Sequence, residues 1–97
     1  MRRAHRIDQN QPEIVEGLRG ERHRVLILAA LGEGKPDLLV ADHETGILVL
    51  LEVKMPGCKL TPDEIEWHAR WRWPVYVVHS LSEAFGAIAT ERRRLGV

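Results

Sequence analysis

An acidic and a basic side chain stand two residues apart where an apolar run ends. The run covers Ile47 to Val53, and Glu52 and Lys54 close it in the order Glu-Val-Lys. Successive side chains of a strand point to opposite faces, so Glu52 and Lys54 share one face while Val53 points to the core behind them. Charges are costly at the end of a buried strand, which indicates that they have a chemical purpose there.

A second acid precedes the neighbouring strand. Asp37 follows a proline and begins a predicted strand, and a turn at residues 43–46 leads from that strand to the apolar run. Antiparallel pairing around this turn brings Asp37 opposite the region of Glu52. Two converging carboxylates make an oxygen site suited to Mg²⁺ or Mn²⁺. A lysine beside such a site can orient a nucleophilic water or stabilise the charge that develops on a phosphate.

A simpler interpretation makes Glu52 and Lys54 a surface ion pair and Asp37 a turn residue. Exposed ion pairs are common and contribute little to stability. An isolated Glu-x-Lys favours that interpretation, because short motifs often occur by chance. The complete order, with Pro-Asp, a turn, an apolar strand and then Glu-x-Lys, favours a reactive site instead.

The elements that would position these residues alternate between helices and strands. The spacing predicts a helix over 11–19, strands over 25–30, 37–41 and 47–53, a helix over 62–72, a strand over 75–78 and a helix over 81–94. Asn10 is the predicted N-cap of the first helix, and Thr61 and Glu64 form a capping box before the second. A strand, a helix and a further strand indicate a crossover, so part of the sheet is parallel. We expect one α/β domain over residues 1–97, with a mixed four-stranded sheet between helices in the order αβββαβα.

The segment Gly34 to Asp37, followed by Glu52 to Lys54, resembles the PD-(D/E)xK nuclease motif. The rest of the chain resembles the small stand-alone, phage-type form of the VRR-NUC (virus-type replication-repair nuclease) family. The residues that carry this resemblance are 8–11 with Ile14 and Val15, 34–40, 50–54, 60–64, Trp67 and His68, and 75–80 with Glu83 and Ala84. The resemblance implies a restriction-endonuclease-like core and a metal-dependent DNA endonuclease, with selectivity for branched DNA such as junctions or flaps as one form of it. It implies no small-molecule cofactor.

The resemblance also implies a role for each residue of the motif. Asp37 and Glu52 would ligate Mg²⁺ or Mn²⁺, with the Val53 carbonyl as a third ligand. Lys54 would be the catalytic lysine. The sequence departs from the family at Lys35, where we expect an apolar or small residue, and this departure affects substrate contacts more than catalysis.

Gln11 is the catalytic candidate from the first helix. Apolar residues at 14, 15 and 18 define the buried face of this helix, and Gln11 falls on that face while Glu13 lies nearly opposite. A buried glutamine at a helix N-terminus could hold a water on the metal or a phosphate, or it could only satisfy backbone groups. Glu13 is expected to stabilise the first turn through the helix dipole.

The charge balance limits how DNA could be held. The sequence has 14 Lys and Arg against 14 Asp and Glu, so a nucleic acid must bind to local patches. Lys35 and Lys59 bracket the motif and are the predicted phosphate contacts. The balance also keeps a second class open, a catalytically silent nucleic-acid-binding or interaction module on a nuclease-like fold. The complete set of Asp37, Glu52 and Lys54 favours the enzyme.

Cysteine and hydropathy patterns bear on location. Cys58 is the single cysteine, so it can form neither an internal disulfide nor a zinc cluster. The longest apolar stretch, Ile47 to Leu51, is too short to cross a bilayer, and the basic segment Met1–Arg6 is not followed by an apolar run. We expect a reduced, cytoplasmic protein that does not enter a membrane.

Three tryptophans lie within or just after the predicted helix 62–72. Trp67 and Trp71 share one face of it, and Trp73 follows. Such a helix either packs into the core or meets a partner. A 97-residue chain has a small core, and tryptophan is favoured at interface centres. Because paired cuts in opposite DNA strands need two sites related by a two-fold axis, we expect a homodimer that uses this helix.

Overall fold

The structure, a computed structural model, describes residues 8–97. The basic segment Met1–Arg6, on which the expected cytoplasmic location partly rests, lies outside the described residues. Within the described part of the chain, no helix has the length and apolar character needed to cross a membrane.

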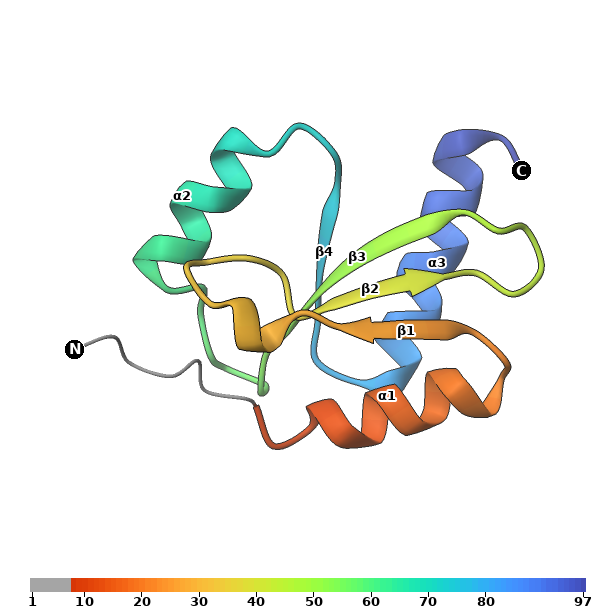
Figure 1. The fold of residues 1–97 in the computed structure, drawn as a ribbon, viewed down its shortest axis with the longest axis horizontal. Helices are drawn as coiled ribbons and strands as arrows, with labels where there is room; N and C mark the ends of the chain where they lie inside the picture. The colour runs from red at the N-terminus through yellow and green to blue at the C-terminus, as the bar shows by residue number, and fades with distance from the viewer. Residues whose placement is uncertain (1–7) are drawn as a thin grey trace.

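Helices and strands follow one another in the predicted order. The elements are α1 (Gln11–Gly20), β1 (Arg24–Ile27), the 3₁₀ helix η1 (Ala29–Leu31), β2 (Leu38–Ala41), β3 (Leu48–Val53), α2 (Pro62–Arg70), β4 (Val75–Val78) and α3 (Leu81–Leu95). The prediction of an α/β chain with four strands and three helices is confirmed by this arrangement (Figure 1).

One four-stranded sheet runs through the molecule in the order β1-β2-β3-β4. The first three strands pair antiparallel, whereas β3 and β4 pair parallel across the connection that contains α2. The predicted mixed sheet and its parallel crossover are therefore confirmed.

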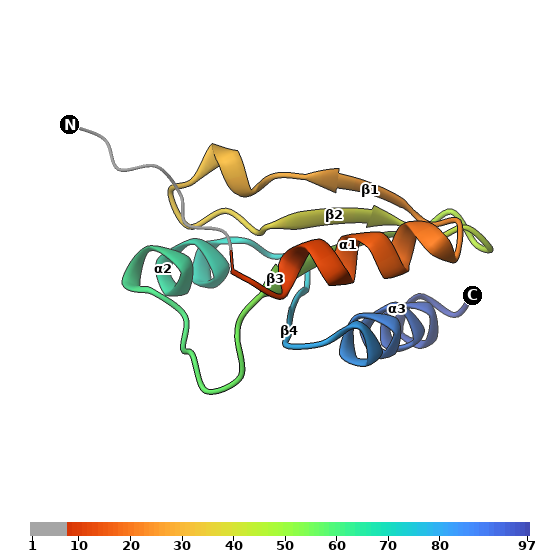
Figure 2. The same ribbon diagram turned by 90° about the horizontal axis from the view of Figure 1, so that it is seen from below.

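The core lies on one face of this sheet. Helices α1 and α3 both pack against that face (Figure 2). On β3, the alternate residues Val49, Leu51 and Val53 point into the core, as the period of two requires. Leu48, Leu50 and Glu52 therefore belong to the opposite face of the sheet, which neither α1 nor α3 covers.

Helix α2 lies at the end of the sheet, apart from α1 and α3 (Figures 1 and 2). Glu64 is its one buried residue, while Ile65 is 56% exposed and Trp71, just after the helix, is 47% exposed. The interpretation that this helix is buried in the core is therefore wrong.

Two predicted boundaries shift by more than one residue. The first strand ends at Ile27 because the chain then turns into η1, and helix α2 ends at Arg70, two residues early. Asn10 is the N-cap residue of α1, as predicted, but its side chain makes no capping hydrogen bond.

The turn between β2 and β3 is tied to the C-terminal helix. Gly46 adopts φ 76°, and its N–H donates to the carbonyl oxygen of Asp42 at 2.8 Å. The buried Asp42 carboxylate accepts two hydrogen bonds from Arg92 of α3, each of 2.7 Å. This bidentate pair holds the turn that sets the β2–β3 register.

Candidate functional site

Asp37 and Glu52 meet where β2 begins and β3 ends. Leu38 pairs with Leu51, so Asp37 lies opposite Glu52 one step further on. The N–H of Val53 donates to Oδ2 of Asp37 at 2.7 Å, which binds the carboxylate to the end of β3. Asp37 is 1% exposed and Glu52 is fully buried. The predicted convergence of the two acids is confirmed.

Glu52 is buried without hydrogen-bond donors. Among residues 8–97, neither of its carboxylate oxygens has a partner in hydrogen-bonding geometry. The nearest cationic candidate, Nε2 of His68, is 3.5 Å from Oε1 and is itself without a hydrogen-bond partner. Burial lowers the pKa of His68, so its imidazole is neutral near pH 7 and leaves Glu52 uncompensated.

The surroundings of Glu52 also oppose its ionisation. Burial raises the pKa of Glu52 far above its ordinary value, and the neighbouring carboxylates of Asp37 and Glu64 raise that pKa further. Two carboxylates can share a hydrogen bond only if one of them keeps a proton. The site therefore either retains a proton or receives a cation.

Lys54 extends to Glu64 rather than to Glu52. Its Nζ lies 2.7 Å from Oε1 of Glu64, and both side chains are nearly buried. Burial alone would lower the pKa of Lys54, but the hydrogen bond and charge of Glu64 outweigh it and raise that pKa. For Glu64, burial likewise opposes the shift, and the bond from Lys54 lowers its pKa below the ordinary value. The pair is ionised, which leaves one fixed ammonium beside Glu52.

The start of α2 brings Glu64 to this place. Thr61 and Glu64 form the predicted capping box, with the Thr61 N–H donating to Oε1 of Glu64 at 2.8 Å. Gly34 allows α2 to come this close, because a Cβ at that position would lie 2.2 Å from the backbone oxygen of Asp63. The glycine before the Lys-Pro-Asp segment thus lets α2 close over Asp37.

The beginning of α1 is attached to the same edge of the sheet. The side-chain amide of Asn10 donates to the carbonyl oxygens of Lys54 and His79, both at 3.0 Å. Gln11 is buried and Glu13 is exposed, as the helical pattern predicts. Gln11 Oε1 is buried without a hydrogen-bond partner among the described residues, and no hydrogen bond links it to Asp37, Glu52 or Lys54. Its catalytic role stays a prediction.

The two predicted phosphate contacts lie outside this buried group. Lys35 is half-buried, and its Nζ lies 3.2 Å from Oε2 of Glu33. Lys59 is exposed in the loop between β3 and α2, which extends away from the body of the molecule (Figure 2). Both lysines flank the motif in sequence, and their contact with DNA stays a prediction.

The donor set fits a hard cation. As the side chains stand, no three His, Cys, Asp or Glu residues within 8–97 form a ready-made metal group. However, the two unpartnered oxygens of Glu52 lie beside the Asp37 and Glu64 carboxylates, and hard oxygen ligands are those that Mg²⁺ and Mn²⁺ prefer. Asp37 and Glu52, with the Val53 carbonyl, are the residues that would hold such an ion.

Sequence reasoning missed two members of this group, Glu64 and His68. The sequence predicts Glu64 only as a member of the capping box, and a histidine within a helix, such as His68, is more often a packing residue than a site residue. Their spacing of four residues places both on one face of α2, which is a usable signal. That α2 turns this face toward Glu52 depends on a loop of eight residues, 54–61, whose path no local pattern gives.

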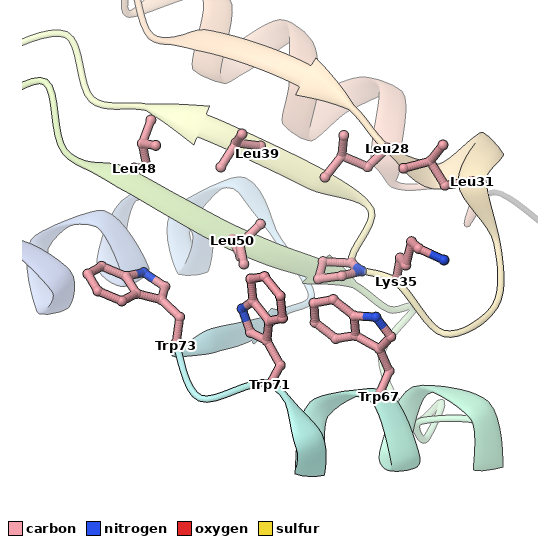
Figure 3. Close-up of a pocket in the computed structure, with 10 residues that line it drawn as sticks. Leu28, Leu31, Lys35, Leu39, Leu48, Leu50, Trp67, Trp71 and Trp73 are labelled. Atoms are coloured by element: carbon pink, nitrogen blue, oxygen red, sulfur yellow. The ribbon is translucent and has the colours of Figure 1, made fainter.

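An apolar groove adjoins the acidic group on the uncovered face of the sheet. It encloses about 510 Å³. Its lining residues are Leu28, Leu31, Lys35, Pro36, Leu39, Leu48, Leu50, Trp67, Trp71 and Trp73 (Figure 3). Two of these lining residues, Pro36 and Trp67, are the chain neighbours of Asp37 and His68.

Comparison of the chain with models of protein families, with curated proteins and with solved structures found no match.

Proposed function

We propose that this protein is a Mg²⁺- or Mn²⁺-dependent DNA endonuclease with a restriction-endonuclease-like core of the VRR-NUC type. The observation that carries the proposal is the buried, unpartnered carboxylate of Glu52, with Asp37 opposite it and Lys54 two residues on. A folded protein retains so costly an arrangement where a bound cation compensates it. The motif resemblance described above supports the same chemistry.

Each residue then has a definite task. Asp37 and Glu52 hold the ion together with the Val53 carbonyl. Glu64 holds the Lys54 ammonium in place, and that ammonium orients the attacking water or stabilises charge on the phosphate. A bound Mg²⁺ or Mn²⁺ would supply Lewis-acid polarisation of the phosphodiester and a lowered pKa for water.

The test is cleavage of a panel of DNAs: a four-way junction, a flap, a single strand and a plain duplex, each with Mg²⁺, Mn²⁺ or EDTA. We expect cutting with either metal and none in EDTA. Asp37→Asn, Glu52→Gln and Lys54→Met should each abolish cutting, whereas Asp63→Asn, on an exposed acid of α2, should leave it unchanged. Full activity in the Lys54 variant would refute the assignment of the lysine.

A catalytically silent nucleic-acid-binding or interaction module is the second candidate. The observation that favours it is the Lys54–Glu64 ion pair, because an ammonium already bound to a carboxylate is less available to a phosphate. This function predicts binding of DNA or protein with no cleavage under any metal condition. The same panel therefore separates the two functions.

A further inference from the structure

We propose that His68 is a nitrogen ligand of the cation held at Glu52, and that this ligand makes the site bind Mn²⁺ more tightly than Mg²⁺. The inference rests on the proposed function, which supplies the cation. It adds a residue that lies outside the Pro-Asp and Glu-x-Lys segments, and it concerns which ion the site selects.

His68 and Glu52 face each other with atoms that have no other partner. Nε2 of His68 lies 3.5 Å from Oε1 of Glu52. Both atoms are buried, and neither makes a hydrogen bond among residues 8–97. An N–H···O hydrogen bond spans about 2.7–3.2 Å. Two ligands of one ion, each about 2.0–2.2 Å from it, lie roughly 3–4 Å apart, so the separation fits a shared ion better than a direct bond.

The position of His68 follows from a regular match between α2 and the end of β3. Glu52 and Lys54 are two residues apart on an extended chain, which spans about 6.6 Å. Glu64 and His68 are four residues apart on a helix, which spans about 6 Å. Because these lengths are similar, Glu64 binds Lys54 while His68 faces Glu52. The contacts that hold Glu64 in place therefore hold His68 as well.

The imidazole of His68 is also oriented by its aromatic neighbours. Its side chain is only 16% exposed. The Trp67 ring meets it edge to face, with ring centroids 6.1 Å apart and an angle of 76° between the planes. Trp67 in turn stacks on Trp71, with centroids 4.7 Å apart. A ligand that is already oriented loses little entropy when it binds an ion.

The other histidines of residues 8–97 have different contacts. Nδ1 of His23 accepts a hydrogen bond from the backbone N–H of His43, whose own side chain is exposed. Nδ1 of His79 lies 2.9 Å from Oε1 of Glu83. The Lys54 ammonium has no lone pair to offer a metal. A nitrogen found on an ion bound at Glu52 would therefore be that of His68.

A nitrogen ligand changes which ion the site prefers. Asp37 and Glu52 alone would form an all-oxygen site, and Mg²⁺ is bound mainly by oxygen ligands and water. Imidazole suits transition-metal ions, whose affinity for a mixed site rises from Mn²⁺ to Co²⁺. His68 should therefore raise the affinity for Mn²⁺ and Co²⁺ and contribute little to the binding of Mg²⁺.

The first test uses the wild-type protein and does not depend on cleavage. We expect the electron spin echo of bound Mn²⁺ to show modulation from a directly bound nitrogen. Calorimetric titration should show tighter binding of Mn²⁺ than of Mg²⁺. Bound Mn²⁺ without nitrogen modulation would overturn the proposal.

His68→Gln separates a ligand from a packing residue. It replaces the imidazole with an amide whose oxygen can still meet a hard ion, so we expect Mn²⁺ affinity to fall about ten- to a hundredfold and Mg²⁺ affinity to stay nearly unchanged. His43→Gln is the matched control on an exposed histidine and should bind both ions as the wild type does. Equal losses for the two ions would contradict the proposal. If His68→Gln does not fold, the wild-type spectrum decides alone.

Binding and cleavage together distinguish this inference from the nuclease proposal. Nitrogen modulation from bound Mn²⁺, with no cleavage of any DNA, would refute the nuclease and support His68 as a ligand. Cleavage with Mn²⁺ bound but no nitrogen modulation would refute the role of His68 alone. Absence of binding for both ions would refute both proposals.

Discussion

Glu52 is the residue at which the stability and the proposed function of this chain conflict. Its side chain is fully buried, and no donor among the described residues satisfies its oxygens. An unsatisfied buried polar group costs about 1–3 kcal/mol, and more if it is charged. No hydrogen bond within the described residues offsets this cost, whereas a bound divalent cation would offset it.

Glu52→Gln should therefore stabilise the metal-free protein. The raised pKa means that the folded state binds a proton above pH 4.5 that the unfolded state has lost, so wild-type stability falls as pH rises above that value. Glutamine has no such proton to lose. We expect the variant to melt several degrees higher at pH 8, about 1–2 kcal/mol, with the gap closing toward pH 4.

Adding Mg²⁺ should reverse this order. The ion should raise the melting temperature of the wild-type protein and leave that of Glu52→Gln nearly unchanged, because the variant keeps only one of the two carboxylates that hold the ion. Glu66→Gln, on an exposed acid of α2, should follow the wild type in every condition. A Glu52→Gln variant that is less stable than wild type at pH 8 without metal would contradict the proposed strain.

Glu64 should act through Lys54. Glu64→Ala removes the carboxylate that lies 2.7 Å from Nζ and also half of the capping box, so the ammonium loses its fixed position. We expect kcat to fall about ten- to a hundredfold, with DNA affinity nearly unchanged. Glu64→Gln keeps an acceptor for Nζ and should restore most of the rate.

The comparison of these two variants separates positioning from folding. Glu66→Ala, 65% exposed on the same helix, is the control for general effects on α2. If Glu64→Gln were as slow as Glu64→Ala at equal stability, the negative charge and not the position of Lys54 would matter.

At the scale of elements, the contact of α2 with the segment before β2 decides whether the site is assembled. Gly34 has φ 81° and would place a Cβ 2.2 Å from the Asp63 backbone oxygen. Backbone cannot move aside as the end of a flexible side chain can. The start of α2, and with it Glu64, depends on this close approach.

Gly34→Ala should displace α2, and Gly57→Ala is its matched control. Both glycines have positive φ, so both variants lose about 1 kcal/mol to backbone strain, but a Cβ at Gly57 meets nothing within 4 Å. We expect Gly34→Ala to lose more stability than Gly57→Ala and to lose cleavage as well. Melting curves and initial rates of the two variants check this, and equal losses would show that the contact is unimportant.

The elements also show what the sequence could and could not reveal. The β2–β3 register was predictable because the turn at 43–46 is short and marked by Gly46, and a fixed turn places Asp37 opposite Glu52. The predicted capping box of α2 forms, since it depends on neighbouring residues. Asn10 occupies the predicted N-cap position but does not cap the helix with its side chain, because its amide donates to carbonyl oxygens 44 and 69 residues away.

On the scale of the whole molecule, the two faces of one sheet have different surroundings. One face packs against α1 and α3, and the other carries the acidic site at one end and the apolar groove along the rest. Neither α1 nor α3 covers this second face (Figure 2).

Basic and acidic residues balance over the whole chain, so DNA must be held by a few local cations. The loss of one such cation should therefore change the salt dependence of DNA binding by a measurable amount. Each phosphate contact contributes about 0.9 to the slope of log K against log salt. Measured in the Glu52→Gln background, so that DNA stays intact, Lys59→Ala should reduce this slope by about one. Lys35→Ala should reduce the slope less, because Glu33 already neutralises that lysine.

Arg70→Ala is the control. Arg70 is 81% exposed on α2 and lies outside the predicted contacts, so its removal should not change the slope. A slope that Lys59→Ala leaves unchanged would place the DNA backbone on another part of the surface.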